Sequence, residues 1–452
     1  MASASDRGFQ RSSSISLVFR LFVLGAAIGG VTTAPAIAQT PSAPASTAAT
    51  PAAAATSAAP AASQTPPAAA PVTAGWQDGF FIQSANGDNR LQLGTVIQLD
   101  GRFTTDDPAP FTDTFTIRKA RPTLQGRVAK YFDFRLTPEL GNGAATVLDA
   151  YIDTRFSTAF RVRAGKDKTP VGLEVLYADP GLLFPERSFA SSLIPNRDVG
   201  VQVLGDLAGA KLSYALGVFN GVVDGSNSTT DLDTNNGKDV AGRVLYQPFR
   251  STATPASALS NLFFHLGAST GTQSGATLPS FKTSAGQTYF SYAGASADGG
   301  RVRVTPAVAY YYKGLGTFAE YARTTQDISK AGVRNSITND GWDITGTWIL
   351  TGETASSGVI RPKVPFDPST GHWGAVQIVA RYSQLRVDQT AFDAGLAAAG
   401  TSRKAQQVTA GVDWYPVQFV KYYLAFERTS FDGGAGTRPD ENSIIFRTQL
   451  AF

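Results

Sequence analysis

Charged side chains alternate with apolar ones along many short stretches of this 452-residue chain. Successive side chains of an extended strand point to opposite faces, so each stretch would carry its charges on one face. The arginines placed on these polar faces are Arg102, Arg135, Arg155, Arg161, Arg163, Arg301, Arg303 and Arg447. The carboxylates on the same faces are Asp100, Asp133, Glu139, Asp149, Asp153 and Asp413. If the arginines outnumber the carboxylates, such a surface attracts anions. Alternatively, each arginine pairs with a carboxylate on a neighbouring strand and the two charges only neutralise each other.

Residue types that commonly supply catalytic or metal-binding groups are scarce. The chain has no Cys, which excludes disulfides and thiolate metal sites. A general base is most often His, and His265 and His372 are the two in the sequence. We interpret His265 as a side chain that fills a strand and His372, beside Trp373, as a surface residue. We therefore expect no enzyme, no cofactor and no metal, with a membrane lipase or protease as the alternative.

The charge balance gives no support for a nucleic-acid partner. Charged residues make up 16% of the chain, below the usual quarter, and the formal net charge is +4. A net charge of this size does not by itself predict binding to nucleic acid.

The N-terminal region divides into two segments that are expected to lie outside the folded domain. Residues 1–38 resemble a secretory signal peptide, with three arginines, a short apolar core and a small-x-small cleavage pattern at Ala36–Ala38. An anchoring transmembrane helix is the alternative, although the apolar core is short for a span. Residues 39–74 are rich in Ala and Pro and carry no charge, which predicts a disordered periplasmic linker.

The last ten residues, Ser443 to Phe452, alternate between apolar and mixed side chains. One expected face carries Ile444, Phe446, Leu450 and Phe452, and the other carries Ile445, Arg447, Gln449 and Ala451. A terminal strand with an apolar face invites aggregation unless its edge is paired and that face is covered. A closed barrel in a lipid bilayer meets both needs. The last strand of a soluble sandwich is the alternative.

Similar alternating segments recur from about Asn89 onward, and we count about sixteen strands. Helical patterns are almost absent, and the expected turns alternate between short and long. Aromatic residues gather near expected strand ends, as interfacial girdles require, at Tyr310–Tyr312, Trp414–Tyr415 and Tyr422–Tyr423. The sequence therefore predicts an all-β fold over residues 75–452, a transmembrane antiparallel β-barrel too wide for side chains to fill.

The stretch from Thr169 to Arg197 is long for a connection between two strands, so we expect it to have a function. Its apolar residues are Leu173, Leu176, Leu182, Leu183, Phe184 and Leu193. Such a loop could fold into the barrel as a constriction, with its apolar side resting on the wall. The alternative is an external loop packed on itself or on a neighbouring subunit.

At the level of motifs, the chain resembles the phosphate-selective porin O/P family from about Leu91 to Phe452. The matching stretches are LQLGTVIQLDGRF (91–103), IRKARPTLQGRV (117–128), LDAYIDTRF (148–156), VRAGKDKTPVGLE (162–174), PERSFASSLIPNRDVGVQ (185–202), LTGE (350–353), RYSQL (381–385) and GVDWYP (411–416). The resemblance implies a sixteen-stranded barrel in the bacterial outer membrane, usually trimeric, with an inward-folded third loop. It also implies a row of arginines that leads anions to a basic constriction.

Within this resemblance, Arg118 and Lys119 match the basic pair that begins the family's row, and Asp149 matches an acidic residue beside the constriction. Val96 and Val175 stand at two constriction positions where phosphate-binding members carry Arg and Lys. This departure predicts a modest anion preference and only weak block of chloride current by phosphate. The expected pore-lining residues are Arg102, Arg118, Lys119, Arg135, Asp149, Arg155, Arg161, Arg163, Arg301 and Arg303.

These observations predict an outer-membrane porin, a water-filled channel for passive diffusion of small solutes. The expected solutes are anions, phosphate included, and neutral molecules. The expected partners are outer-membrane lipids, two further copies of the chain in a homotrimer, and peptidoglycan through the linker. The alternatives are a general non-selective porin and a non-conducting barrel that is anchored to the cell wall.

Overall fold

The computed structural model describes residues 71–141, 143, 145–228, 233, 235–251, 257–434, 436 and 438–452. The chain separates into two units, Met1–Pro67 and Ala68–Phe452, and the description below concerns the second. The expected signal peptide (1–38) and nearly all of the expected linker (39–74) lie outside the described residues.

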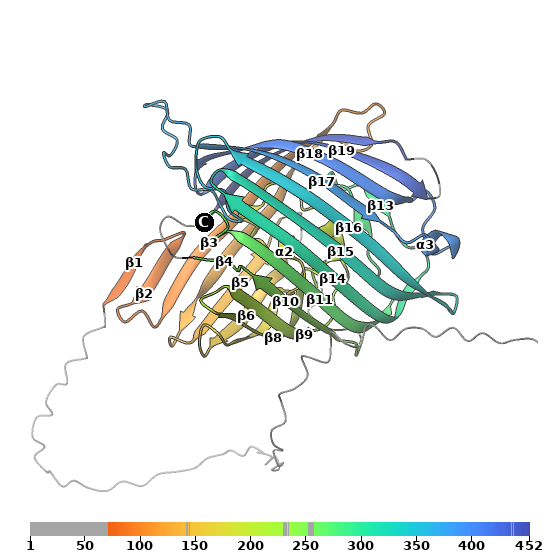
Figure 1. The fold of residues 1–452 in the computed structure, drawn as a ribbon, viewed down its shortest axis with the longest axis horizontal. Helices are drawn as coiled ribbons and strands as arrows, with labels where there is room; N and C mark the ends of the chain where they lie inside the picture. Colours follow the sequence, from red (N-terminus) through yellow and green to blue (C-terminus); the bar gives the residue numbers. More distant parts are fainter. Residues whose placement is uncertain are drawn as a thin grey trace, which may run out of the picture. The chain divides into compact units, whose positions relative to one another are not determined.

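Sixteen antiparallel strands close into a barrel, because the last strand pairs with the first (Figure 1). Each strand pairs with the next along the chain, and Ser443 to Ala451 of β20 pair with Thr104 to Val96 of β3. The strands are β3 (Arg90–Thr104), β4 (Thr114–Val128), β5 (Phe132–Glu139), β6 (Thr146–Arg155), β7 (Arg161–Lys168), β8 (Arg197–Leu207), β9 (Leu212–Phe219), β10 (Asp239–Tyr246), β11 (Leu262–Gly275), β14 (Ser296–Tyr312), β15 (Leu315–Lys330), β16 (Val333–Ile349), β17 (Ala375–Arg386), β18 (Ser402–Val417), β19 (Val420–Gly434) and β20 (Glu441–Ala451). The predicted fold class is confirmed.

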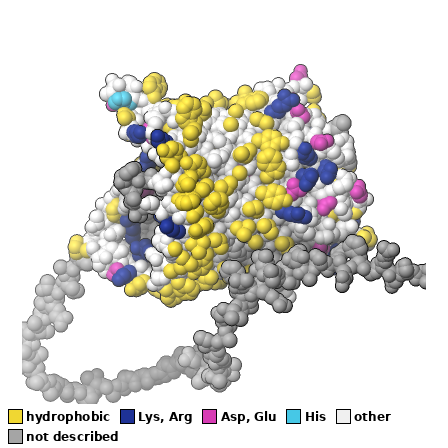
Figure 2. All heavy atoms as spheres, in the orientation of Figure 1, with side chains coloured by type: hydrophobic (Ala, Val, Ile, Leu, Met, Phe, Trp, Pro, Cys, Tyr) yellow, Lys and Arg dark blue, Asp and Glu magenta, His cyan; other side chains and the backbone are white. Residues whose placement is uncertain are grey.

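Apolar side chains face outward along these strands, and Figure 2 shows them spread over the outer surface of the barrel. On β20, Phe446 and Leu450 are exposed, whereas Ile445 and Arg447 on the alternate face are almost completely buried. Leu424 of β19 stands beside Phe446 on the outer face and is also exposed. The alternation predicted for the C-terminal strand is therefore confirmed, and the outward row suits contact with lipid.

The aromatic groups near strand ends divide between the two faces of the wall. Tyr422 stacks between Trp414 and Phe446 on the outer face, with ring centroids 5.1 and 6.3 Å away. Tyr415 and Tyr423, by contrast, are buried inside the barrel. The prediction that all of these aromatics form outer girdles is thus wrong for alternate members, because consecutive side chains of a strand point to opposite faces.

Connection lengths do not alternate strictly between the two ends of the barrel. We call the end where β3 begins and β20 finishes the terminal end, and the opposite end the loop end. The tight turn at Ala331–Gly332 lies at the loop end, whereas residues 350–374 form a long connection at the terminal end. Ala355 and Ile360 of that connection are buried with Tyr311, which faces the barrel interior. This connection is therefore long because part of it enters the barrel.

A hairpin of β1 (Val72–Trp76) and β2 (Phe80–Ser84) extends the wall at the terminal end. β2 pairs with the first residues of β3, next to the stretch of β3 that pairs with β20. The ring of Trp76 lies 5.0 Å from that of Phe452 and 5.3 Å from that of Phe419. The expected boundary between residues 74 and 75 thus falls inside β1, because Val72 to Ala74 pair with β2.

The remaining elements are short and belong to loops. They are α2 (Leu173–Leu176), η1 (Asp179–Gly181), η2 (Ala190–Leu193), β12 (Phe281–Lys282), β13 (Thr288–Phe290) and α3 (Thr390–Asp393). Within the described part of the chain, none of the helices has the length and hydrophobicity needed to cross a membrane.

Candidate functional site

The loop between β7 and β8, residues 169–196, lies inside the barrel and is bonded to the far wall. The backbone N–H groups of Leu173 and Glu174 donate to the Glu320 carboxylate at 2.6 and 3.2 Å. The Lys421 ammonium donates to the Leu182 carbonyl at 2.7 Å. These bonds reach β15 and β19, so the expected inward-folded loop is confirmed and the alternative of an external loop is wrong.

The apolar side of this loop packs on the same wall. The loop residues in the cluster are Val171, Val175, Phe189, Ala190, Leu193 and Ile194, and the wall residues include Ala322, Ile337, Leu385 and Ala405. Burial of these side chains excludes water between the loop and β15 to β18. The space left for solutes therefore lies against the opposite wall, from β3 to β8.

Three cavities follow that wall from the loop end to the terminal end. The outer cavity has a volume of about 690 Å³, the middle cavity about 440 Å³ and the inner cavity about 490 Å³. Arg121 and Arg197 line both the outer and the middle cavity. Asp78, Gln125 and Tyr151 line both the middle and the inner cavity. Neither His residue lines any of the three.

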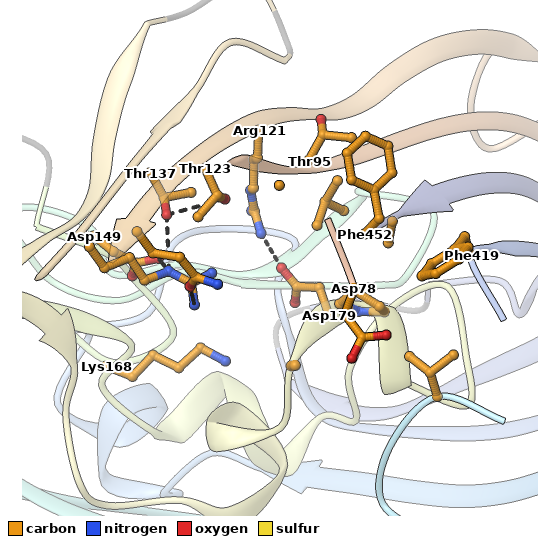
Figure 3. A pocket seen from close by; sticks show the side chains of 18 of the residues that line it. Asp78, Thr95, Arg121, Thr123, Thr137, Asp149, Lys168, Asp179, Phe419 and Phe452 are labelled. Atoms are coloured by element: carbon orange, nitrogen blue, oxygen red, sulfur yellow. Dashed lines mark hydrogen bonds and ion pairs between the residues drawn. The ribbon is translucent and has the colours of Figure 1, made fainter. Parts of the chain in front are cut away.

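Basic side chains surround Asp179 where the outer and middle cavities meet. Asp179 accepts from Arg187 at 2.8 Å and lies 3.0 Å from the Lys119 ammonium. It also contacts Arg121, as Figure 3 shows. Burial opposes the charge of this loop carboxylate, but Lys119, Arg187 and Arg121 outweigh it and hold its pKa well below the usual range. Asp179 is therefore an anion that keeps three cations at the narrow point.

Arg197 and Lys168 complete this group on its other side. Arg197 donates to Asp149 at 2.7 Å, and Lys168 donates to the Tyr177 carbonyl at 2.7 Å. We call Lys119, Arg121, Lys168, Arg187 and Arg197 the basic cluster. The carboxylates in contact with it are Asp149, Asp179 and Glu139. Cations thus outnumber carboxylates here, and guanidinium groups are suited to bind oxyanions through paired N–H donors.

The outer cavity is strongly basic. Its basic lining residues are Arg102, Arg118, Lys119, Arg121, Arg187, Arg197 and Lys282, and Glu186 is the one acidic residue that lines it in the described structure. Glu186 accepts from Arg102 at 2.6 Å and from Arg118 at 2.8 Å. Burial opposes its charge, but Arg118 and Arg102 hold the pKa of this loop carboxylate well below its usual range.

The inner cavity is more balanced in charge. Its basic residues are Arg90, Arg127, Arg161 and Arg163, and its acidic residues are Asp78, Asp133 and Asp153. Arg163 lies 2.8 Å from Asp153, which also contacts Arg161. Arg161 and Arg163 therefore pair with a carboxylate, as the alternative interpretation of the sequence expected.

The predicted pore-lining residues divide into those that reach a cavity and those that do not. Arg102, Arg118 and Lys119 line the outer cavity, and Arg135 and Asp149 line the middle one. Arg155 lines none of the three cavities and lies 3.1 Å from Asp133.

Arg301 and Arg303 face the interior but lie beneath the segment between β9 and β10. Arg303 donates to Asp224 of that segment at 2.6 Å and to Asp239 at 2.7 Å, and Arg301 donates to Asp239 at 2.8 Å. Both side chains are almost completely buried. The expectation that they line a wet path is wrong, because this segment covers them and Asp224 within it pairs with Arg303.

The two expected constriction valines lie in different surroundings. Val96 lines the middle cavity, and its register partner on β4 is Arg121. Val175 borders the outer cavity but is almost fully buried in the apolar cluster under the loop. A cation therefore stands beside Val96 on the neighbouring strand, at a position that motif comparison did not single out.

Sequence reasoning missed Arg121, Lys168, Arg187 and Arg197. For Arg121 the cause is a β-bulge: Gln98 pairs with Lys119 and Leu99 pairs with Ile117, which leaves Arg118 as an extra residue. The bulge changes the phase of β4, so Arg118, Lys119 and Arg121 all reach the cavities. The phase of this strand could not be determined from alternation alone.

Comparison with solved structures finds the same barrel at low sequence identity. The outer membrane channel DcaP of Acinetobacter baumannii is 12% identical, with a TM-score of 0.52 over 82% of this chain and 99% of that one. OmpTΔL8, a loop deletion mutant of an outer membrane protein of Vibrio cholerae, is 11% identical, with a TM-score of 0.50 over 81% of this chain and all of that one. At these identities the likeness shows the fold alone. No curated protein matched the sequence.

A family model described as phosphate-selective porin O and P matches residues 91–452. The match includes all sixteen strands of the barrel apart from the first residue of β3. Family and fold indicate a channel rather than an enzyme. The chain therefore belongs to the phosphate-selective porin O and P family and is a porin of the bacterial outer membrane, a channel for solute diffusion.

Proposed function

We propose that this porin prefers small anions, phosphate included, over cations. The observation that supports the proposal most directly is the lining of the outer cavity, where seven basic side chains stand with one carboxylate. Fixed positive charge in a narrow aqueous space attracts anions and repels cations. This excess of basic side chains includes Arg121 and Arg197, which also line the middle cavity.

The basic cluster would act as the point of closest contact with the solute. An oxyanion that arrives there exchanges water for N–H donors of guanidinium and ammonium groups. Asp179 and Asp149 keep these cations in place and compete with the solute for them. This competition favours weak binding and rapid release, which passage through a channel requires.

The proposal revises the expected weak block by phosphate. That expectation rested on the absence of cations at Val96 and Val175. Arg121 stands directly beside Val96, and Arg187 lines the outer cavity with Val175. We therefore propose that Arg121 and Arg187 supply the cations that the two valines lack.

The test is the block of single-channel chloride current by added phosphate. For the native chain we expect block at millimolar phosphate. For Arg121→Gln we expect roughly tenfold weaker block, since one charge-assisted hydrogen bond is lost. Arg386→Gln is the matched control, because Arg386 is exposed on the outer face of β17 and pairs with Asp340.

Two outcomes would contradict the proposal. Equal phosphate block in the native chain and in Arg121→Gln would show that the basic cluster does not bind the solute. Absence of stepwise current in a folded preparation would favour the non-conducting barrel.

We also propose that the chain forms a homotrimer and has no catalytic activity. The mass of the detergent-solubilised complex tests whether it is a trimer.

A further inference from the structure

Three carboxylates meet between the loop of residues 169–196, which we call the constriction loop, and the wall on which it packs. They belong to Glu174 of α2, Glu320 of β15 and Asp343 of β16, and all three residues are buried. One oxygen of each lies within 4.8 Å of the others. Glu320 and Asp343 are direct register partners on neighbouring strands. Like charges placed opposite each other in a sheet repel, so this arrangement calls for a compensating charge.

Two of the carboxylates accept hydrogen bonds that favour their charged form. Glu174 Oε2 accepts from the Ser188 backbone N–H at 3.0 Å, and from the hydroxyls of Ser188 and Ser191 at 2.7 Å each. Glu320 accepts the two backbone N–H groups at the start of α2. These hydrogen bonds therefore help to hold the loop against β15.

Arg381 forms an ion pair with the group. Its Nη1 lies 3.6 Å from Glu174 Oε1 and donates to the Glu186 carbonyl at 3.0 Å. Its guanidinium also lies 4.4 Å from the centre of the Phe184 ring. One guanidinium can balance one of the three carboxylates, so two negative charges would remain in this buried site if all three were ionised.

Asp343 provides an independent sign of a missing ligand. Its side chain is about 1% exposed, and within the described structure Oδ1 has no hydrogen-bond partner. The other oxygen, Oδ2, is 3.5 Å from the Thr345 hydroxyl. A buried carboxylate oxygen without a partner is costly, and native structures rarely leave one unsatisfied.

We propose that Glu174, Glu320 and Asp343 bind one Ca²⁺ ion. The two missing positive charges equal the charge of a divalent cation. The donors are carboxylates with Ser and Thr hydroxyls beside them, and an all-oxygen environment suits a hard cation. Ca²⁺ fits this enclosed, irregular group better than Mg²⁺, which demands octahedral geometry and retains its waters. The ion joins the constriction loop to β15 and β16 and thereby stabilises the loop in its inward position.

The experiment measures Ca²⁺ binding to the full-length protein in detergent after removal of divalent cations with a chelator. Titration calorimetry should show one Ca²⁺ per chain, and added Ca²⁺ should raise the thermal unfolding temperature. Asp343→Asn should weaken binding roughly tenfold or more, because it removes a charged ligand. The matched control is Asp340→Asn, since Asp340 lies on the same strand and pairs with Arg386 rather than with the group.

The proposal would be overturned if the native chain showed no saturable Ca²⁺ binding. It would also be overturned if Asp343→Asn bound Ca²⁺ as tightly as the native chain. A further outcome is that Asp343→Asn unfolds at a higher temperature than the native chain without Ca²⁺, and that Ca²⁺ has no effect on the native chain. This outcome would show that protons, rather than Ca²⁺, neutralise the carboxylates. If Asp343→Asn does not assemble, anomalous scattering from crystals of the native chain with Ca²⁺ decides. A peak among the three carboxylates supports the site, and its absence overturns it.

Discussion

Arginine side chains along the barrel wall differ in what they can do, because their neighbours differ. Arg163 is held by Asp153 and Asp167, and Arg303 is enclosed with Asp224 and Asp239. Arg121 also pairs with carboxylates, those of Glu139 and Asp179, but it stands where two cavities meet and other basic side chains surround it. Alternation in the sequence indicates which side of the wall an arginine occupies. It does not indicate whether a loop covers that arginine or a carboxylate neutralises it.

The two valines offer a direct comparison at the residue scale. Val96→Arg should be tolerated and should strengthen phosphate block, because its side chain enters the middle cavity beside Arg121. Val175→Lys should lower the free energy of unfolding by roughly 3 kcal/mol, because it places a charge in the apolar cluster with Phe189 and Leu193. Single-channel currents and urea unfolding measure the two effects. A stable Val175→Lys variant would show that this part of the loop leaves the wall.

At the scale of elements, the constriction loop depends on carboxylates with lowered pKa values. Asp179 and Glu186 both have folded-state pKa values well below the usual range. A carboxyl group whose pKa is lower in the folded than in the unfolded chain stabilises the fold at pH values above its unfolded-state pKa of about 4. This contribution is lost as the pH falls from there through the pKa of the folded state. The loop should therefore stay bound to its cations when the pH falls to about 4.

This pH dependence should be measurable as a change in the noise of the open-channel current. Open-channel noise should stay constant from neutral pH to about pH 4 and rise only below it, when the loop loses its ion pairs. Asp179→Asn should be noisy already at neutral pH, because Lys119, Arg121 and Arg187 lose their shared anion. Noise that rises between pH 7 and pH 5 would contradict the role given to these two carboxylates.

Closure of the barrel depends on the last residue as well as on β20. Phe452 exchanges backbone hydrogen bonds with Thr95 at 2.8 and 3.1 Å, and its ring contacts Trp76. Deletion of Phe452 should reduce the amount of folded, heat-modifiable protein in the membrane, whereas Phe452→Trp should preserve it. Normal assembly of the deletion variant would show that strand pairing alone suffices.

Strands were predictable from the sequence, and loop placement only in part. The pattern on β20 is clear because apolar residues recur at positions 444, 446, 450 and 452, whereas Arg447 and Gln449 stand on the other face. The bulge at Arg118 is a local break in register that alternation cannot locate. Residues of the 350–374 connection, such as Ile360, enter the barrel through contacts with distant strands, and no local pattern encodes such contacts. The β1–β2 hairpin escaped notice because Val72 continues directly from the Ala/Pro-rich tract.

For the whole molecule, the boundary of the folded unit can be tested by proteolysis. Of the expected linker, residues 39–74, the part before Val72 should be removable, and the resistant core should begin at or just before Val72 because β1 pairs with β2. N-terminal sequencing of the core locates its first residue. A core that begins after Ser84 would contradict the pairing of the hairpin with β3.

The excess of basic groups in the outer cavity should give the channel a preference for anions over cations. Its most direct test is the reversal potential of the native channel in a planar bilayer with unequal KCl concentrations on the two sides. Potassium and chloride have similar mobilities in water, so a non-selective pore gives a potential near zero. We expect a reversal potential whose sign shows that chloride passes more readily than potassium. The magnitude of this potential should fall as the salt concentration rises, because salt screens the fixed charges. A potential near zero at low salt, or one of the opposite sign, would contradict the claim.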